Sequence, residues 1–409
     1  KVFRARFQIL SKGFQIPIFV KFVSKTSKSF QNRKFFFKNR KNLRKIGLGN
    51  LIQFICAFTI GCGLLGGLDA LVPQAWGANR KDLACTYVIQ ARTVCAILYI
   101  LLIPLMIFSG DILISLGQDG DVAMYASQYN KAALPGIFFF FQLDTARRFL
   151  YNIDRPLPAT VIMVSTSILH VFWSYYFVYE LGWLNYGLGI ANSITWTLSS
   201  VILNGYICFN WRELELPSRF AVMFSGFSEC GGWERMKEFL NVGLPAALWS
   251  CSECWWWQSQ CLLVGLISST ALAANVALMQ CVELLCMIAH GSANTAVSLV
   301  GNAIGNGNVK MAKTYAAITC VFGGLVGALI LVPVLLIFDN QIAMILTDQR
   351  EVQSIFKRIM HIDCYSLVFD QCAIILCGSL RSLNHTWGDS DLQSDWELRD
   401  YVTRKYRSR

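Results

Sequence analysis

The stretch CSECWWWQSQCLLVGLI (residues 251–267) belongs to a long apolar run and yet contains polar groups. This combination indicates the fold class. The run containing it is long enough to cross a bilayer, which takes about 20 apolar residues. Yet it carries one carboxylate, Glu253, two glutamines and three consecutive tryptophans. Ionisable groups are costly within a membrane, so such a carboxylate is by default a candidate for a functional site.

The composition extends this interpretation to the whole chain. Of the 409 residues, 55% are hydrophobic and only 15% are charged, which is typical of a polytopic membrane protein rather than a soluble enzyme. The continuous apolar blocks exclude a barrel of alternating strands, and the absence of a nucleotide-binding loop argues against ATP-driven pumping. Nine windows are predicted to be membrane helices: 47–72, 84–109, 122–144, 157–180, 185–209, 237–266, 270–300, 312–338 and 353–380.

The net charge of +11 comes from the first part of the chain. Residues 1–45 hold fourteen Lys and Arg and no acidic residue, so the remainder is slightly acidic and no nucleic-acid partner is expected. The segment is compatible with a mitochondrial presequence, a polybasic surface segment or a foreign leader. We expect residues 1–46 to lie outside the fold.

The fifteen cysteines are scattered through the apolar windows, as small apolar helix residues are. CSEC has zinc-like spacing, but no second CxxC or HxxxH follows it in a loop. We therefore predict no metal site and no cofactor.

An internal repeat relates two segments at an offset of 228 residues. LVPQAWGANRKDLA (71–84) and LVGNAIGNGNVKMA (299–312) share five of fourteen residues, and each ends a predicted membrane helix. The same offset pairs Gln142 with Asp370. Parallel halves with equal orientation are an arrangement typical of transporters that bind substrate between two bundles.

These segments resemble the eukaryotic branch of the multidrug and toxic compound extrusion (MATE) transporter family. The matching stretches are GLGNLIQFICAF to GLDALVPQAWGANR (47–80), ALPGIFFFFQLDTARRFL (133–150), LGWLNYGLGIANSITW (181–196), LVGNAIGNGN (299–308) and FDQCAIILCGSLR (369–381). The resemblance implies an all-α integral membrane protein, a two-bundle exporter with about nine of the family's twelve transmembrane helices.

The expected division is an N-terminal bundle at 47–209, a cytoplasmic linker at 210–236, a C-terminal bundle at 237–383 and a polar tail at 384–409. The first helix of the family would be missing before Gly47, and the last two after residue 383. Short basic connections place the loops after the first, third and fifth windows on the cytoplasmic side.

The resemblance also implies which residues couple an ion to transport. Asp370 matches the carboxylate of the family's tenth helix and is expected to be buried. Glu253 and Glu283 would assist it. Gln258 stands where the family has a second glutamate of its seventh helix, and an amide cannot exchange a proton. The structural alternative for each acid is a hydrogen-bond anchor between helices.

Other polar and aromatic residues are candidates for the cavity wall: Gln142, Gln280, Trp255 and Trp256. A tryptophan ring face attracts cations, although packing or anchoring at the interface is the alternative.

Further polar residues are expected to be structural. Arg147 and Arg148 are expected to snorkel to the cytoplasmic interface. Gln74 is expected to bond between helices, and Gly77 to permit a tight helix exit.

The predicted function is secondary active antiport of organic cations or xenobiotics against protons or sodium, by a monomer in the bilayer of the plasma membrane or a vacuolar or vesicular membrane. Two alternatives stay open: a partial or inactive MATE-like protein, and a flippase for lipid-linked substrates.

Overall fold

A computed structural model describes residues 52–383, except 116, 118–119, 224–231 and 347–349. The predicted leader (1–46) and tail (384–409) lie outside these residues. The described part is helical, without a strand, and each of the nine predicted windows falls on a helical segment. The helices are η1 (Gln53–Phe58), α5 (Thr59–Leu64), α6 (Gly66–Gly77), α7 (Lys81–Ile107), α8 (Ser109–Ser115), α9 (Gly120–Asn152), α10 (Pro156–Tyr175), η2 (Tyr176–Glu180), α11 (Leu184–Phe209), α12 (Gly232–Ile267), α13 (Ser269–Gly305), α14 (Val309–Val326), η3 (Gly327–Leu331), α15 (Val332–Ile337), α16 (Asp339–Leu346) and α17 (Arg350–Arg381).

Six helical segments of the described residues are long and apolar enough to cross a membrane. They are Gln53–Gly77, Lys81–Ile107, Pro156–Glu180, Thr270–Gly305, Val309–Ile337 and Arg350–Arg381. The predicted spans on α9, α11 and α12 are longer than a bilayer requires but more polar.

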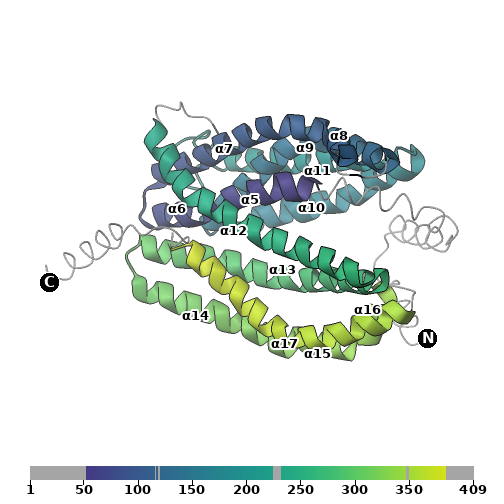
Figure 1. Cartoon of the computed structure of the whole chain (residues 1–409). Helices are drawn as coiled ribbons and strands as arrows, with labels where there is room; N and C mark the ends of the chain where they lie inside the picture. The colour runs from purple at the N-terminus through teal and green to yellow at the C-terminus, as the bar shows by residue number, and fades with distance from the viewer. Residues whose placement is uncertain (1–51, 116, 118–119, 224–231, 347–349, 384–409) are drawn as a thin grey trace, which may run out of the picture.

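The helices form two groups, as Figure 1 shows. Helices α5 to α11 pack together on one side and α13 to α17 on the other, while α12 runs obliquely between them. The first group is held by a core that includes Phe141, Phe149 and Leu203, and the second by one that includes Leu335 and Phe356.

Helix α12 is predicted to belong with the C-terminal bundle, but its buried side chains pack elsewhere. Met236, Phe239, Val242 and Ala247 belong to the first core, and α12 contacts α5, α6 and α7 as well as α13. The division at 210–236 stays a prediction about domains; the packing makes α12 a shared element.

The internal repeat is confirmed as a repeat of structure. Both copies end their helix in a Schellman motif, in which a residue in the left-handed region lets the last turn close. That residue is Asn79 (φ 58°) in the first copy and Gly307 (φ 72°) in the second. The bonds match at the offset of 228: Arg80 to Ala75 and Asn79 to Trp76 in one copy, Asn308 to Ala303 and Gly307 to Ile304 in the other, all between 2.8 and 2.9 Å.

The two copies also pack against each other, because α6 lies along α13. A Cβ atom on Gly77 would lie 2.2 Å from the Asn302 carbonyl oxygen, and one on Gly305 would lie 2.2 Å from that of Gln74. These two pairs are equivalent under the repeat offset. Gly77 therefore serves the contact between the groups of helices, while Asn79 makes the turn that was predicted for Gly77.

Candidate functional site

The three predicted carboxylates lie on three different helices: Glu253 on α12, Glu283 on α13 and Asp370 on α17. Helix α13 packs along α17 and contacts α12. Gln371, the residue after Asp370, donates to Cys286 Sγ on α13 at 3.7 Å, and Cys286 lies three residues after Glu283. Asp370 and Glu283 therefore lie near the α13–α17 contact, and Glu253 lies on the adjoining helix α12.

The expectation that Asp370 is buried is wrong for the described structure, because its side chain is exposed, as are those of Glu253 and Glu283. The reason is the helical period of α17. Its buried residues recur every three or four positions, at Cys364, Leu367, Gln371 and Ile375. Asp370 lies on the flank of that stripe and is exposed, and its exposed neighbour Phe369 lies on the far side.

The amide and aromatic candidates are also accessible. Gln258 is half-buried and Gln280 exposed, while Trp255 and Trp256 are 53% and 67% exposed. On α12, Cys251 and Cys254 are buried instead, as are several residues earlier on the helix. The two side chains are thus accessible to a solute or to lipid.

The sequence analysis missed Asp363, a further acid on α17. It lies seven residues before Asp370, which is about two helical turns, so both acids project from one side of α17. The Ser366 hydroxyl donates a hydrogen bond of 3.3 Å to Oδ1 of Asp363. The spacing of the two acids was the available signal.

A second polar cluster is a buried ion network on α6 and α9. Arg148 donates to Asp69 at 2.6 Å and to Asp144 at 2.9 Å, and Arg147 also pairs with Asp144. Both carboxylates are at least 95% buried. The expectation that Arg147 and Arg148 snorkel is wrong: Asp144, one turn earlier on α9, and Asp69 across the interface provide partners inside the protein.

Polar contacts from this region cross between the two groups of helices. Gln74 donates to the Ser382 carbonyl oxygen at 2.6 Å, which confirms the predicted role of Gln74 between helices. Asn302 donates to the Asn152 carbonyl oxygen at 3.1 Å, and Arg381 lies 3.7 Å from Asp69. These contacts reinforce the glycine-mediated approach of α6 and α13.

Gln142, a predicted cavity residue, accepts a hydrogen bond from Arg92 on α7 at 2.6 Å. The other terminal nitrogen of Arg92 donates to Asn204 on α11, also at 2.6 Å. Sequence analysis did not single out Arg92, which lies in the middle of an apolar window and could have been noticed for that reason.

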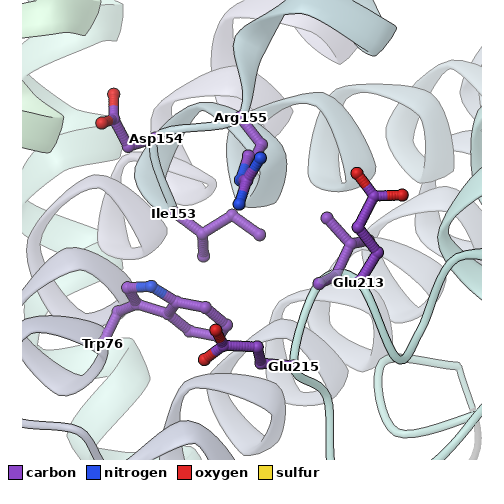
Figure 2. A pocket seen from close by; sticks show the side chains of 7 residues that line it. Trp76, Ile153, Asp154, Arg155, Glu213 and Glu215 are labelled. Atoms are coloured by element: carbon purple, nitrogen blue, oxygen red, sulfur yellow. The ribbon is translucent and has the colours of Figure 1, made fainter.

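An open pocket of about 440 Å³ lies beside Trp76 of α6, and no predicted site residue is among the residues that line it (Figure 2). Trp76, Arg155, Glu213 and Glu215 are among its lining residues. Lys81 forms an ion pair with Glu215 and lies 5.2 Å from the centre of the Trp76 ring. The hydrogen bond from Lys81 lowers the pKa of the Glu215 carboxyl. Lys81, at the border of the pocket, is thus already held by the Trp76 ring and the Glu215 carboxylate.

Comparison with known proteins decides the family. The MatE family model matches residues 41–176 and 245–386, which together are more than half of the chain. The chain belongs to the MATE family. Members of the MATE family are multi-pass membrane transporters, not enzymes.

Individual relatives agree with the family. The chain is 27% identical to Protein DETOXIFICATION 36 of Arabidopsis thaliana over 78% of its own length and 63% of that protein. It is 28% identical to Multidrug and toxin extrusion protein 1 of Danio rerio, over 84% of its own length and 56% of that protein. The chain thus spans less than two thirds of the length of these relatives.

Solved structures show the same fold. The crystal structure of the eukaryotic MATE transporter AtDTX14 superposes with a TM-score of 0.72 at 24% identity, covering 83% of this chain and 74% of that one. An outward-facing multidrug resistance MATE transporter of the MOP superfamily gives 0.75 at 19% identity, covering 84% and 75%.

Proposed function

We propose that the protein is a secondary active antiporter that exports an organic cation or related xenobiotic in exchange for protons, with sodium as the alternative coupling ion. The single observation that supports this most is that Glu253, Glu283 and Asp370 lie on three helices that pack on one another through α13, with Asp370 next to the α13–α17 contact. The relatives named for detoxification and for multidrug and toxin extrusion support the solute class.

The chemistry of the site favours competition between ion and solute. A carboxylate binds a cation when ionised and loses that attraction when it is protonated. Asp370 is accessible, so both a proton and a solute can reach it. Because Gln258 cannot exchange a proton, the coupling falls to the acids, with Asp370 in the leading role. The aromatic face of Trp255 or Trp256 would add attraction for the solute cation.

The proposed working unit is a monomer in a lipid bilayer, with solute and ion bound alternately as the two groups of helices change their relative position. In this scheme the packed contact of α6 with α13 closes one side of the protein. That contact would have to part for the site to open there.

The experiment is transport by the full chain in liposomes, with a fluorescent organic cation and an imposed pH gradient. We expect flux driven by the gradient, and Asp370→Asn to reduce it to the level of protein-free liposomes. The matched control is Glu351→Gln, which removes an exposed acid from the same helix and should leave the flux unchanged.

Replacing the pH gradient with a sodium gradient distinguishes the two coupling ions. Full gradient-driven flux by Asp370→Asn would refute the assignment of that residue. No flux under either gradient by the unmodified chain would favour the inactive MATE-like alternative.

A further inference from the structure

Arg92 is a cation within a membrane helix whose observed partners are neutral. Its terminal nitrogens donate to the amide oxygens of Gln142 and Asn204, both at 2.6 Å. None of the ion pairs found in the described part of the chain includes Arg92. A charge inside a protein normally has a counter-charge, because removing it from water is costly.

Part of the hydrogen-bonding capacity of Arg92 is unused. A guanidinium has five N–H donors in a planar fork, and two are used by the amides. The Nε atom is buried and has no hydrogen-bond partner among the described residues. Arg92 as a whole is partly exposed while its Nε atom is buried, so a small acidic group would approach the terminal nitrogens.

The amide partners are themselves positioned. Asn204 donates from its side-chain nitrogen to the Ser200 carbonyl oxygen at 2.8 Å, one turn earlier on α11. This bond directs the Asn204 oxygen towards Arg92. The guanidinium is therefore held by α9 and α11 without being neutralised.

The contrast with Arg147 and Arg148 is informative. These two arginines, on neighbouring α9, are neutralised by Asp144 and Asp69 inside the same group of helices. The structural arginines of this group of helices thus pair with carboxylates, whereas Arg92 contacts amides.

The internal repeat sharpens the contrast. At the offset of 228, Gln142 corresponds to Asp370. One half of the repeat therefore presents an acid at this position, and the other presents an amide attached to an arginine.

We propose that Arg92 is a binding point for the anionic group of a small organic solute, a carboxylate or sulfonate. The planar fork of arginine matches the two oxygens of such a group. The solute's acid would provide the counter-charge that the described chain does not. This binding point lies in the N-terminal half, apart from the acids of the proposed exchange, and goes beyond that function.

The test is equilibrium binding to the purified full chain in nanodiscs without any gradient, so it does not depend on antiport. The probes are two dyes with one ring system: fluorescein, an anion, and the cationic methyl ester of rhodamine. We expect Arg92→Gln to weaken fluorescein binding by about ten-fold or more, as losing a charged hydrogen bond does. Binding of the rhodamine ester should stay unchanged, and Arg92→Lys should retain part of the fluorescein affinity.

A second variant separates binding from folding. Gln142→Glu places a carboxylate against Arg92 and supplies the counter-charge internally. We expect it to weaken fluorescein binding by about ten-fold while the unfolding midpoint stays equal or rises. A purely structural arginine would show the second effect without the first.

Three results would overturn the proposal. One is the absence of fluorescein binding by the unmodified chain. Another is equal fluorescein binding by Arg92→Gln. The third is parallel weakening of both dyes in Arg92→Gln and Gln142→Glu.

Discussion

Asp69 illustrates how one residue can serve several helices. It lies on α6, accepts a hydrogen bond from Arg148 of α9 at 2.6 Å and lies 3.7 Å from Arg381 of α17. Its side chain is 5% exposed, so solvent can do little to stabilise either the carboxylate or the arginine if one is removed. The residue thus connects the network inside the first group of helices to the end of the second.

Removal of this charge should be destabilising. We predict that Asp69→Asn lowers the free energy of unfolding by about 3–5 kcal/mol, the cost of leaving a buried ion without its partner. Equilibrium unfolding in mixed micelles measures it. Asp154→Asn is the control, because Asp154 is exposed and its positive φ of 61° is tolerated by Asn. Equal stability of the two variants would show that the network contributes nothing.

At the scale of the element, charged residues that pair with a neighbouring helix change the position at which a helix ends. The window predicted at 122–144 stops where charges begin, yet α9 continues to Asn152. The window at 47–72 also stops early, although α6 runs to Gly77 without including a charged residue after position 72. Charged residues continue a membrane helix when a neighbouring helix supplies the counter-charge, and the partner is not visible within the window itself.

The contact of α6 with α13 depends on glycine, and α13 offers its own control. We predict that Gly305→Ala destabilises the protein by about 1–3 kcal/mol, because the added Cβ would meet the Gln74 carbonyl oxygen, a backbone atom. Gly291→Ala on the same helix meets nothing within 4 Å and should be neutral or stabilising by up to about 1 kcal/mol.

Thermal unfolding of the two variants in one detergent compares them directly. If Gly305→Ala is as stable as Gly291→Ala, then the close approach of the two helices is not present in the protein. Restored stability after truncation of a neighbouring side chain is not expected, because the clash is with the backbone.

For the whole molecule, the position of α12 between the two groups is the feature that sequence could not supply. A Cβ on Gly66 of α6 would lie 3.0 Å from the Cβ of Ala246 of α12. We predict that Gly66→Cys with Ala246→Cys forms a disulfide on oxidation, since bridged Cβ atoms lie about 3.5–4.5 Å apart and a small shift suffices.

Peptide mapping by mass spectrometry identifies this bridge among the other cysteines of the chain. Gly291→Cys with Ala246→Cys is the matched control and should stay reduced, because a Cβ at Gly291 has no atom within 4 Å. A bridge in the control, or none in the test pair, would mean that α12 lies elsewhere.

The sequence alone determined the helical membrane class, the nine windows, the repeat and the family, because hydrophobic length and local turn chemistry are written in consecutive residues. It also identified Asp370, Glu253 and Glu283 as acids in membrane helices. Their roles in coupling stay predictions.

Only the tertiary structure decided the partners of the charges. It placed Asp370 on the exposed side of α17, enclosed Arg147 and Arg148 with Asp144 and Asp69, and left Arg92 among amides. The physical reason is that the free energy of a charge in a low-dielectric interior depends on the few ångströms to its nearest counter-charge. Residues far apart in the chain set that distance, so no window of sequence contains it.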